Sequence, residues 1–105
     1  MVEITSGRVH PVSVLKATGA NVVIFGFTEG AELREHSACQ PVLLQGLSGR
    51  LRVSLAGEER ILQSGDLLHI EATLPHSVVA LEDSHLQLTI LMIDSPGPSH
   101  IPLVE

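Results

Sequence analysis

The sequence has few aromatic residues: they make up 2% of its 105 positions and comprise only Phe25 and Phe27. Tryptophan and tyrosine are absent, so the chain lacks the broad rings on which nucleic acid bases stack. Lysine occurs once, at Lys16, and the formal net charge is -6, from 12 acidic and 6 basic residues. A chain without a basic patch does not attract a phosphate backbone, so we expect no nucleic acid partner.

Cysteine and long apolar runs are also scarce. Cys39 is the single cysteine, so no disulfide can form within the chain. No apolar run approaches the roughly 18 to 20 residues of a membrane-spanning helix. Residues 1–12 also lack the charged-then-apolar order of a secretory signal. We therefore expect a cytoplasmic protein without a membrane partner.

Hydrophobic residues are plentiful, at 44% of the chain, and most of them are Val, Leu and Ile. A chain of this length can bury one core, which predicts a single domain over residues 1–105. β-Branched side chains favour strands over helices. We expect the core to cover about residues 12–93. Residues 94–105 contain three prolines and are predicted to form a C-terminal arm.

Apolar stretches recur between turn signals at intervals of about 8 to 12 residues, which predicts eight to ten strands and an all-β sandwich or barrel. Residues 50–55 alternate polar and apolar side chains, as in a half-exposed strand with Arg50 and Arg52 outward. Residues 22–27 are almost wholly apolar, which predicts a strand buried on both sides or nearly so. Gly26 within it indicates a bulge or a close backbone approach.

Two glycine and histidine spacings carry further information. Gly30 is followed after five residues by His36, and twelve more residues separate His36 from Gly49. Gly65 is followed after ten residues by His76. These spacings resemble the two sequence motifs of the cupin superfamily of small barrels. The resemblance implies an all-β, antiparallel jelly-roll fold, also called a double-stranded β-helix.

The resemblance also implies positions for metal ligands. In metal-binding cupins the two motifs supply three histidines and a glutamate to one divalent ion. Carried over to this chain, the first histidine is His36 and the last is His76, but the second falls on Ala38 and the glutamate on Val42. Imidazole suits Zn, Fe, Ni, Mn or Cu, and two histidines alone bind these metals weakly and without selectivity.

A third metal ligand would have to come from a neighbouring side chain, and three are candidates. Gln40 lies four residues after His36 in a loop that could fold inward. Cys39 would bind as a thiolate, although a single cysteine is more often a small buried hydrophobe. His69 lies where cupins often carry an aromatic residue, which favours packing or hydrogen bonding there.

Alternation along the strands predicts that the two histidines share an aliphatic interior. An imidazole in such a place needs a partner, which can be a metal, water, the other imidazole or a ligand. The residues predicted to contact a small molecule are His36, Gln40, Val42, Leu44, His76 and Val78.

Other polar residues are assigned simpler roles. His10, His85 and His100 are predicted to lie at the surface, and Glu35 is predicted to face solvent. Asp66 is predicted to bond backbone amides in its turn, as Asp does in Asx-turns.

Three functions remain open. The first is a small stand-alone cupin of unassigned activity that binds a small molecule near His36 and His76, with or without a weakly held divalent metal. The second, implied by the resemblance, is a metal-dependent enzyme of the dioxygenase or isomerase type. The third is an assembly role, since cupins commonly pair into homodimers and Leu43 and Leu47 are apolar residues predicted to point outward. The sequence assigns no catalytic residue.

Overall fold

The computed structural model describes residues 9–92, and within them the chain forms nine strands and no helix. The predicted all-β architecture is confirmed, and no helix in this range could cross a membrane. The first strand begins at Val9, before the predicted start of the core at residue 12. The predicted C-terminal arm and His100 lie outside the described residues. The strands are β1 (Val9–Ala17), β2 (Ala20–Phe27), β3 (Glu32–His36), β4 (Val42–Ser48), β5 (Leu51–Leu55), β6 (Glu58–Leu62), β7 (Leu67–Ile70), β8 (His76–Ala80) and β9 (Ser84–Leu91).

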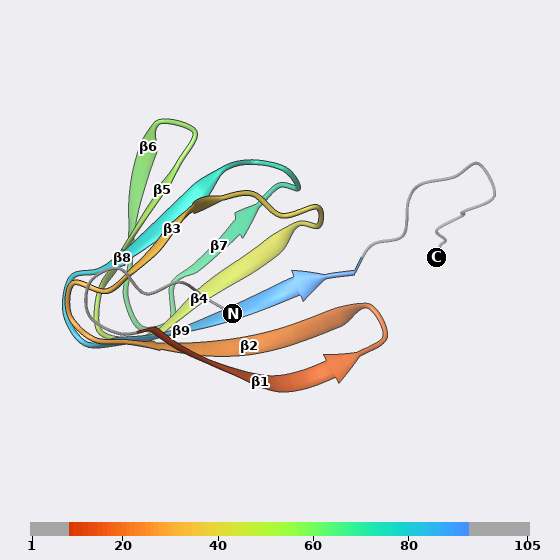
Figure 1. The fold of residues 1–105 in the computed structure, drawn as a ribbon, viewed down its shortest axis with the longest axis horizontal. Coiled ribbons are helices and arrows are strands. Elements are labelled where there is room, and N and C mark those ends of the chain that lie inside the picture. Colours follow the sequence, from red (N-terminus) through yellow and green to blue (C-terminus); the bar gives the residue numbers. More distant parts are fainter. Residues whose placement is uncertain (1–8, 93–105) are drawn as a thin grey trace.

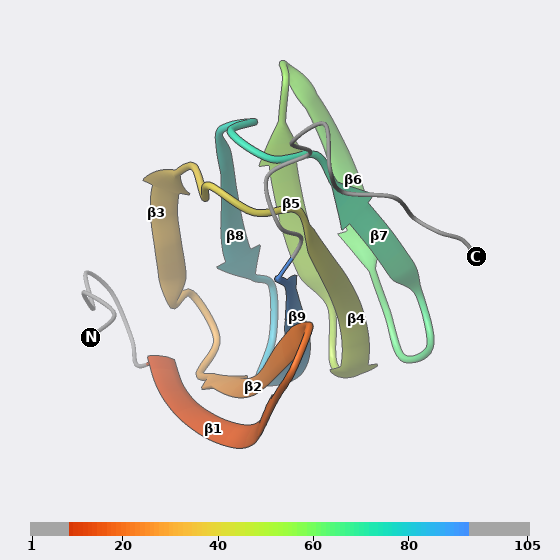
Figure 2. The same ribbon diagram turned by 90° about the vertical axis from the view of Figure 1, so that its right-hand side faces the viewer.

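The strands form two antiparallel sheets, which we call sheet A and sheet B. Sheet A has the order β1-β2-β9-β4-β7, and sheet B has the order β3-β8-β5-β6. In Figure 1, β1, β2 and β9 of sheet A run along the lower side, with β3, β8 and β5 of sheet B above them. Figure 2 shows β3 and β8 of sheet B apart from β1 and β2 of sheet A. Strands distant in sequence become neighbours, as where β9 lies between β2 and β4, and this is a jelly-roll arrangement in a single domain.

The core fills the space between the two sheets and is built from alternating positions. On β5, Leu51 and Val53 have no exposed surface, whereas Arg52 is half-exposed, which confirms the predicted alternation of this strand. Aliphatic side chains dominate, and burial of apolar surface contributes roughly 25 cal/mol per Å². The buried hydrophobic residues are Val9, Phe25, Phe27, Ala31, Leu33, Val42, Leu44, Leu51, Val53, Leu62, Ile70, Val78, Ala80 and Leu86.

Strand β2 departs from its prediction in two respects. Phe25 and Phe27 are buried, but Val22 and Ile24 are only half-buried. The predicted burial on both sides is therefore only partial, because nothing among the described residues covers the outer face of sheet A. The predicted bulge at Gly26 is also wrong, since this residue pairs in regular register with both neighbouring strands.

Turns between the strands use the predicted chemistry. The Asp66 carboxylate accepts a hydrogen bond from the backbone N–H of Gln63 at 2.8 Å, so it bonds a backbone amide in its turn as predicted. The bonded amide precedes Asp66, whereas in an Asx-turn it follows the Asp. Gly49 has φ +76°, and a Cβ there would overlap the Ser84 hydroxyl and the Asp83 backbone oxygen. Only glycine satisfies both the backbone conformation and the close approach at this position.

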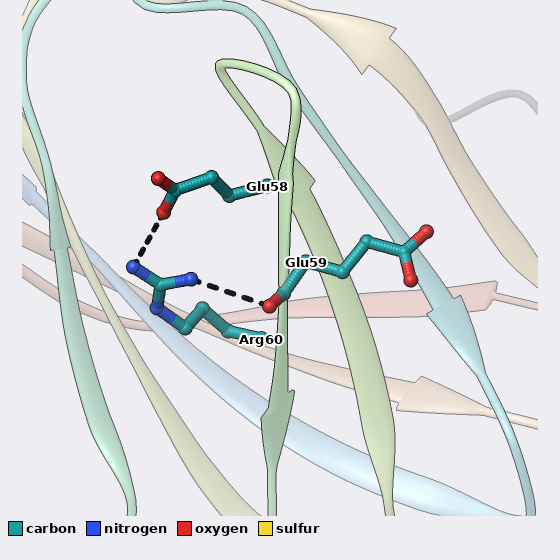
Figure 3. A network of polar contacts seen from close by, with 3 residues as sticks. All are labelled: Glu58, Glu59 and Arg60. Carbon is teal, nitrogen blue, oxygen red and sulfur yellow. Dashed lines mark hydrogen bonds and ion pairs between the residues drawn. The ribbon is translucent and has the colours of Figure 1, made fainter.

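The β5–β6 hairpin lies at one end of sheet B. Its turn places Ala56 and Gly57 in the left-handed region, with φ 51° and 78°. Beyond the turn, the Arg60 guanidinium lies 2.6 Å from the Glu58 carboxylate and donates to the Glu59 backbone oxygen at 3.3 Å (Figure 3). All three residues are exposed, so this network contributes little to stability.

Candidate functional site

His76 occupies the inner face of sheet B. It is the first residue of β8, whose burial alternates, so that His76, Val78 and Ala80 face inward. Its side chain is 2% exposed, which makes it one of two buried polar residues among the described residues, with Ser84. The predicted inward orientation of His76 is confirmed.

His36 reaches the same face because β3 is irregular. Leu33 pairs with Val78, and His36 pairs with His76, so three steps along β3 match two steps along β8. Such an extra residue reverses the direction of the side chains that follow it. Regular alternation from Leu33 would have placed Glu35 opposite His76. His36 remains exposed, because β3 is an edge strand of sheet B.

The two imidazoles lie against each other. Their ring centroids are 4.5 Å apart and their planes are inclined by 58°. Nδ1 of His36 lies 2.8 Å from the Arg34 backbone oxygen, and Nδ1 of His76 lies 3.0 Å from the Leu74 backbone oxygen. A carbonyl oxygen only accepts, so each neutral ring carries its proton on Nδ1 and leaves Nε2 with a free lone pair. This is the tautomer that binds metals or accepts a hydrogen bond through Nε2.

The surroundings of His76 favour its neutral form. Burial is the main cause that lowers its pKa from the usual 6.5; the hydrogen bond to Leu74 acts in the opposite direction, and the charge of His36 lowers the pKa further. A neutral imidazole is the form that offers a lone pair to a ligand.

The remaining positions of the motif carry hydrocarbon. Ala38 is half-buried, and Val42 is 3% exposed within the core. The described residues contain no group of three His, Cys, Asp or Glu side chains close enough to hold one ion. His36 and His76 fit two positions of a metal site, and the chain supplies neither the second histidine nor the glutamate.

The candidate third ligands lie in different places. Cys39 is exposed in the loop after β3, and Gln40 is half-buried in the same loop. His69 alternates with the buried Ile70 on β7, so it points to the outer face of sheet A, where it lies 4.0 Å from Glu71. The structure does not bring Cys39 or His69 together with the two imidazoles.

The predicted aliphatic neighbours belong to the core of the barrel. Val42, Leu44 and Val78 are at most 3% exposed, and all three belong to one buried cluster. Their predicted inward orientation is confirmed. Glu35 is exposed, as predicted.

One contact at the site was not anticipated. The Thr73 N–H donates to the Ala38 backbone oxygen at 2.7 Å, which joins the loop before His76 to the loop after His36. Thr73 has φ 68°, a conformation that a β-branched residue rarely adopts.

Comparison with known proteins agrees with this geometry. The model of the family described as cupin domain matches residues 25–94. The chain belongs to the cupin family. No curated protein matches it.

Solved structures show the same fold at low sequence identity. A cupin superfamily protein from Desulfitobacterium hafniense DCB-2 is 16% identical, with a TM-score of 0.78 over 88% of this chain and 84% of that one. An RmlC-like cupin from Shewanella frigidimarina NCIMB 400 is 20% identical, with a TM-score of 0.77 over 90% of this chain and 86% of that one. KdgF from Halomonas sp. is 23% identical, with a TM-score of 0.73 over 88% of each chain. At these identities the similarity shows the cupin jelly roll and leaves the function open.

Proposed function

We propose that this cupin binds a small molecule at the rim of its barrel through the Nε2 atoms of His36 and His76. The observation that carries the proposal is the pair of rings 4.5 Å apart, each with Nδ1 held by a backbone carbonyl. The two imidazole lone pairs at the edge of an apolar interior can each accept a hydrogen bond from a donor or bind a cation.

The proposed ligand therefore carries a donor group next to a hydrocarbon portion. His36 and Gln40, at the rim, would make its outer contacts. Val42, Leu44 and Val78 would form the aliphatic floor beneath. This arrangement of a few polar groups over an apolar lining is common in small-molecule sites.

A weakly held divalent metal is compatible with the same two atoms. Zn, Fe, Ni, Mn or Cu would bind through the two Nε2 atoms, with Gln40 as the remaining candidate for a third protein ligand. When bound, the ion would act as a Lewis acid toward an oxygen of the ligand. The side chains of this chain orient the ligand, and the hydrogen bonds from Nδ1 to the backbone keep both rings in place.

The experiment is a thermal-shift screen of tag-free protein against small metabolites, with and without EDTA. A ligand at 100 times its Kd stabilises the fold by about 2.7 kcal/mol. We expect His36→Ala to abolish this shift while the protein stays folded, because His36 is exposed. A shift that survives in His36→Ala, or the absence of any stabilising compound, would count against the proposal.

A metal-dependent enzyme of the dioxygenase or isomerase type is the second candidate, and the neutral, oriented imidazoles favour it. It requires metal in the purified protein. Less than about 0.1 equivalent of transition metal, with no gain on reconstitution, would exclude this function.

We further propose that the protein is a homodimer that packs through the part of the outer face of sheet A that carries Val12, Leu15 and Leu67, away from the strand ends at His10 and His85. The strands of sheet A contain one charged residue, Lys16, which pairs with Asn21 and points away from this face. Exposed apolar side chains lie on this face among uncharged polar ones: Val12 and Leu15 are more than half exposed, Leu67 is 62% exposed, and Gln45 and Gln87 lie between them. The four strands of sheet B, in contrast, carry Glu32, Arg34, Glu35, Arg52, Glu58, Glu59 and Arg60.

The distribution of charge favours a second copy as the partner. The chain carries a net charge of -6, so two copies repel each other except where a face is free of charge. A twofold dimer places the same patch against itself, which an uncharged apolar face permits. Leu43 belongs to this face, and Leu47 at its margin is 38% exposed, as the sequence predicted for both.

A further inference from the structure

A second pair of histidines lies on the outer face of sheet A. Cα pairing aligns His10 of β1 with Gly26 of β2, Gly26 with His85 of β9, and His85 with Ser48 of β4. These residues form one row across four adjacent strands. Phe27, next to Gly26, is buried in the core, so the row faces outward.

Ser48 joins this row because β4 contains a bulge. Gly46 pairs with Leu86, and Ser48 pairs with His85, which leaves Leu47 as the extra residue. The bulge turns Ser48 to the outer face, where its hydroxyl lies 2.9 Å from Nδ1 of His85. One nitrogen of the His85 ring is thus occupied, and the ring is held in one orientation.

The other edge of the His85 ring lies over Gly26. A Cβ placed on Gly26 would be 3.6 Å from both Cδ2 and Nε2 of His85. Nε2 therefore lies beside the space that the missing side chain leaves on β2, between β9 and β1. A surface pocket of about 460 Å³ opens here, lined by His10, Gly26, Phe27, Thr28, Ser48, Asp83, Ser84 and His85.

The dimensions of the gap suit a metal ion. Neighbouring strands are about 4.8 Å apart, so the Cα atoms of His10 and His85 are separated by roughly 10 Å across β2. Two imidazoles that approach from opposite sides, each with a metal–nitrogen bond of about 2 Å, can span such a distance.

The charges of the lining favour a cation over an anion. Asp83 contributes a carboxylate to the wall, held by the backbone N–H of Glu29 at 2.8 Å. No lysine or arginine lines the pocket. A phosphate or carboxylate ligand would have no positive partner there, whereas a divalent ion would gain from the negative wall.

We propose that His10 and His85 bind a divalent transition-metal ion through their Nε2 atoms, with Ser48 as the residue that positions His85. Zinc and copper are among the ions that imidazole ligands suit. The part of the chain that the structure describes offers no third His, Cys, Asp or Glu in a metal-binding group, so water completes the coordination. The site lies on the opposite face of its sheet from the barrel interior and does not depend on the function proposed for His36 and His76.

Copper broadening of amide signals in tag-free, isotope-labelled protein locates the ion directly. We expect substoichiometric Cu²⁺ to broaden the amides of Gly26, Phe27, Ser48 and His85. Ions bound at the barrel pair would broaden a separate set around His76, so the two proposals fail independently. If Cu²⁺ broadens other amides and leaves those of Gly26, Ser48 and His85 unaffected, the metal site at His10 and His85 is refuted.

Zinc affinity tests the ligands one by one. We expect His10→Ala and His85→Ala each to weaken Zn²⁺ binding at this site at least tenfold, and Ser48→Ala to weaken it severalfold. Gly26→Ala should also weaken binding without unfolding the protein, since its methyl group would make only ordinary contact with the His85 ring. His69→Ala is the matched control, because His69 is an exposed histidine on the same face. Unchanged affinity in His10→Ala, or an equal loss in His69→Ala, would refute the proposal.

Discussion

His36 and His76 meet with their ring centroids 4.5 Å apart because β3 carries one residue more than the β8 segment it pairs with. The irregularity brings a histidine, rather than Glu35, to the interior side of the strand. A second extra residue, in β4, turns Ser48 toward His85 on the outside of the barrel. Both pairs of polar contacts thus depend on a local break in regular pairing.

Burial of His76 makes the stability depend on pH. Its pKa in the folded protein is lowered, chiefly by burial, below the 6.5 of the unfolded chain. Well above pH 6.5 the imidazole is neutral in both states. As the pH falls through 6.5 the unfolded state takes up a proton first, so the folded state loses stability until the pH reaches its own lowered pKa. We expect His76→Gln to lose less stability than the wild type between pH 7.5 and 5 in urea unfolding. The exposed His69→Gln should keep the wild-type dependence, and an unchanged pH dependence in His76→Gln would contradict the explanation.

Restoring a motif residue should strengthen metal binding at the barrel. Ala38→His places a third imidazole where metal-binding cupins carry their second histidine, in a half-buried position close to His36. A third ligand should raise the Zn²⁺ affinity of the barrel site at least tenfold, measured by competition with a chromophoric chelator. Ala72→His, in the facing loop at a position to which the motifs assign no metal ligand, serves as the control. An Ala38→His protein with wild-type affinity would show that the two histidines do not share one ion.

Thr73 stores backbone strain at the edge of the site. A φ of 68° costs a β-branched residue about 1–3 kcal/mol. Glycine adopts this φ without most of that cost, but its more flexible unfolded chain lowers the stability by about 0.5–1 kcal/mol. We expect Thr73→Gly to raise the free energy of unfolding by about 1 kcal/mol, read from chemical denaturation. Thr73→Val keeps the branching and should not stabilise the protein. A destabilised Thr73→Gly would mean that the side chain contributes more than its strain costs.

Gly49 should tolerate no side chain, whereas Gly19 should tolerate one at moderate cost. Both have positive φ, but only at Gly49 would a Cβ overlap Ser84 and the Asp83 backbone, and nothing lies within 4 Å of the same position at Gly19. Gly19→Ala should cost about 1–2 kcal/mol for its conformation. Gly49→Ala should cost at least about 3 kcal/mol, since overpacking adds about 1–3 kcal/mol. Thermal unfolding of both variants measures the difference, and equal losses would rule out the steric explanation.

A charge placed on the outer face of sheet A should prevent dimerisation. Val12→Glu puts a carboxylate on an apolar, uncharged face, where a second copy would bury it without a partner. We expect the wild type to sediment as a dimer at micromolar concentration and Val12→Glu as a monomer. Ile61→Glu provides a matched control, because Ile61 is an exposed apolar residue of sheet B. A monomeric wild type, or a dimer unaffected by Val12→Glu, would exclude this interface.

The sequence alone determined the class of the fold and the position of one histidine. Short apolar segments between turn residues define strands, because side chains alternate across a pleated sheet with a fixed period of two. The spacing from Gly65 to His76 and the alternation of residues 76–80 placed His76 inside the barrel, and the structure confirms it. Alternation along residues 50–55 also predicted correctly that Arg52 points away from the core.

Tertiary structure decided what alternation cannot describe. An extra residue in a strand leaves no periodic signal, so the orientation of His36 and of Ser48 depended on which residues of the partner strand they met. The outer face of β2 appeared buried in the sequence because Val22 and Ile24 are apolar, yet no described layer covers it. Pairing across four strands brought His10, Gly26 and His85 into one row, because contacts between distant segments arise only when the whole sheet assembles.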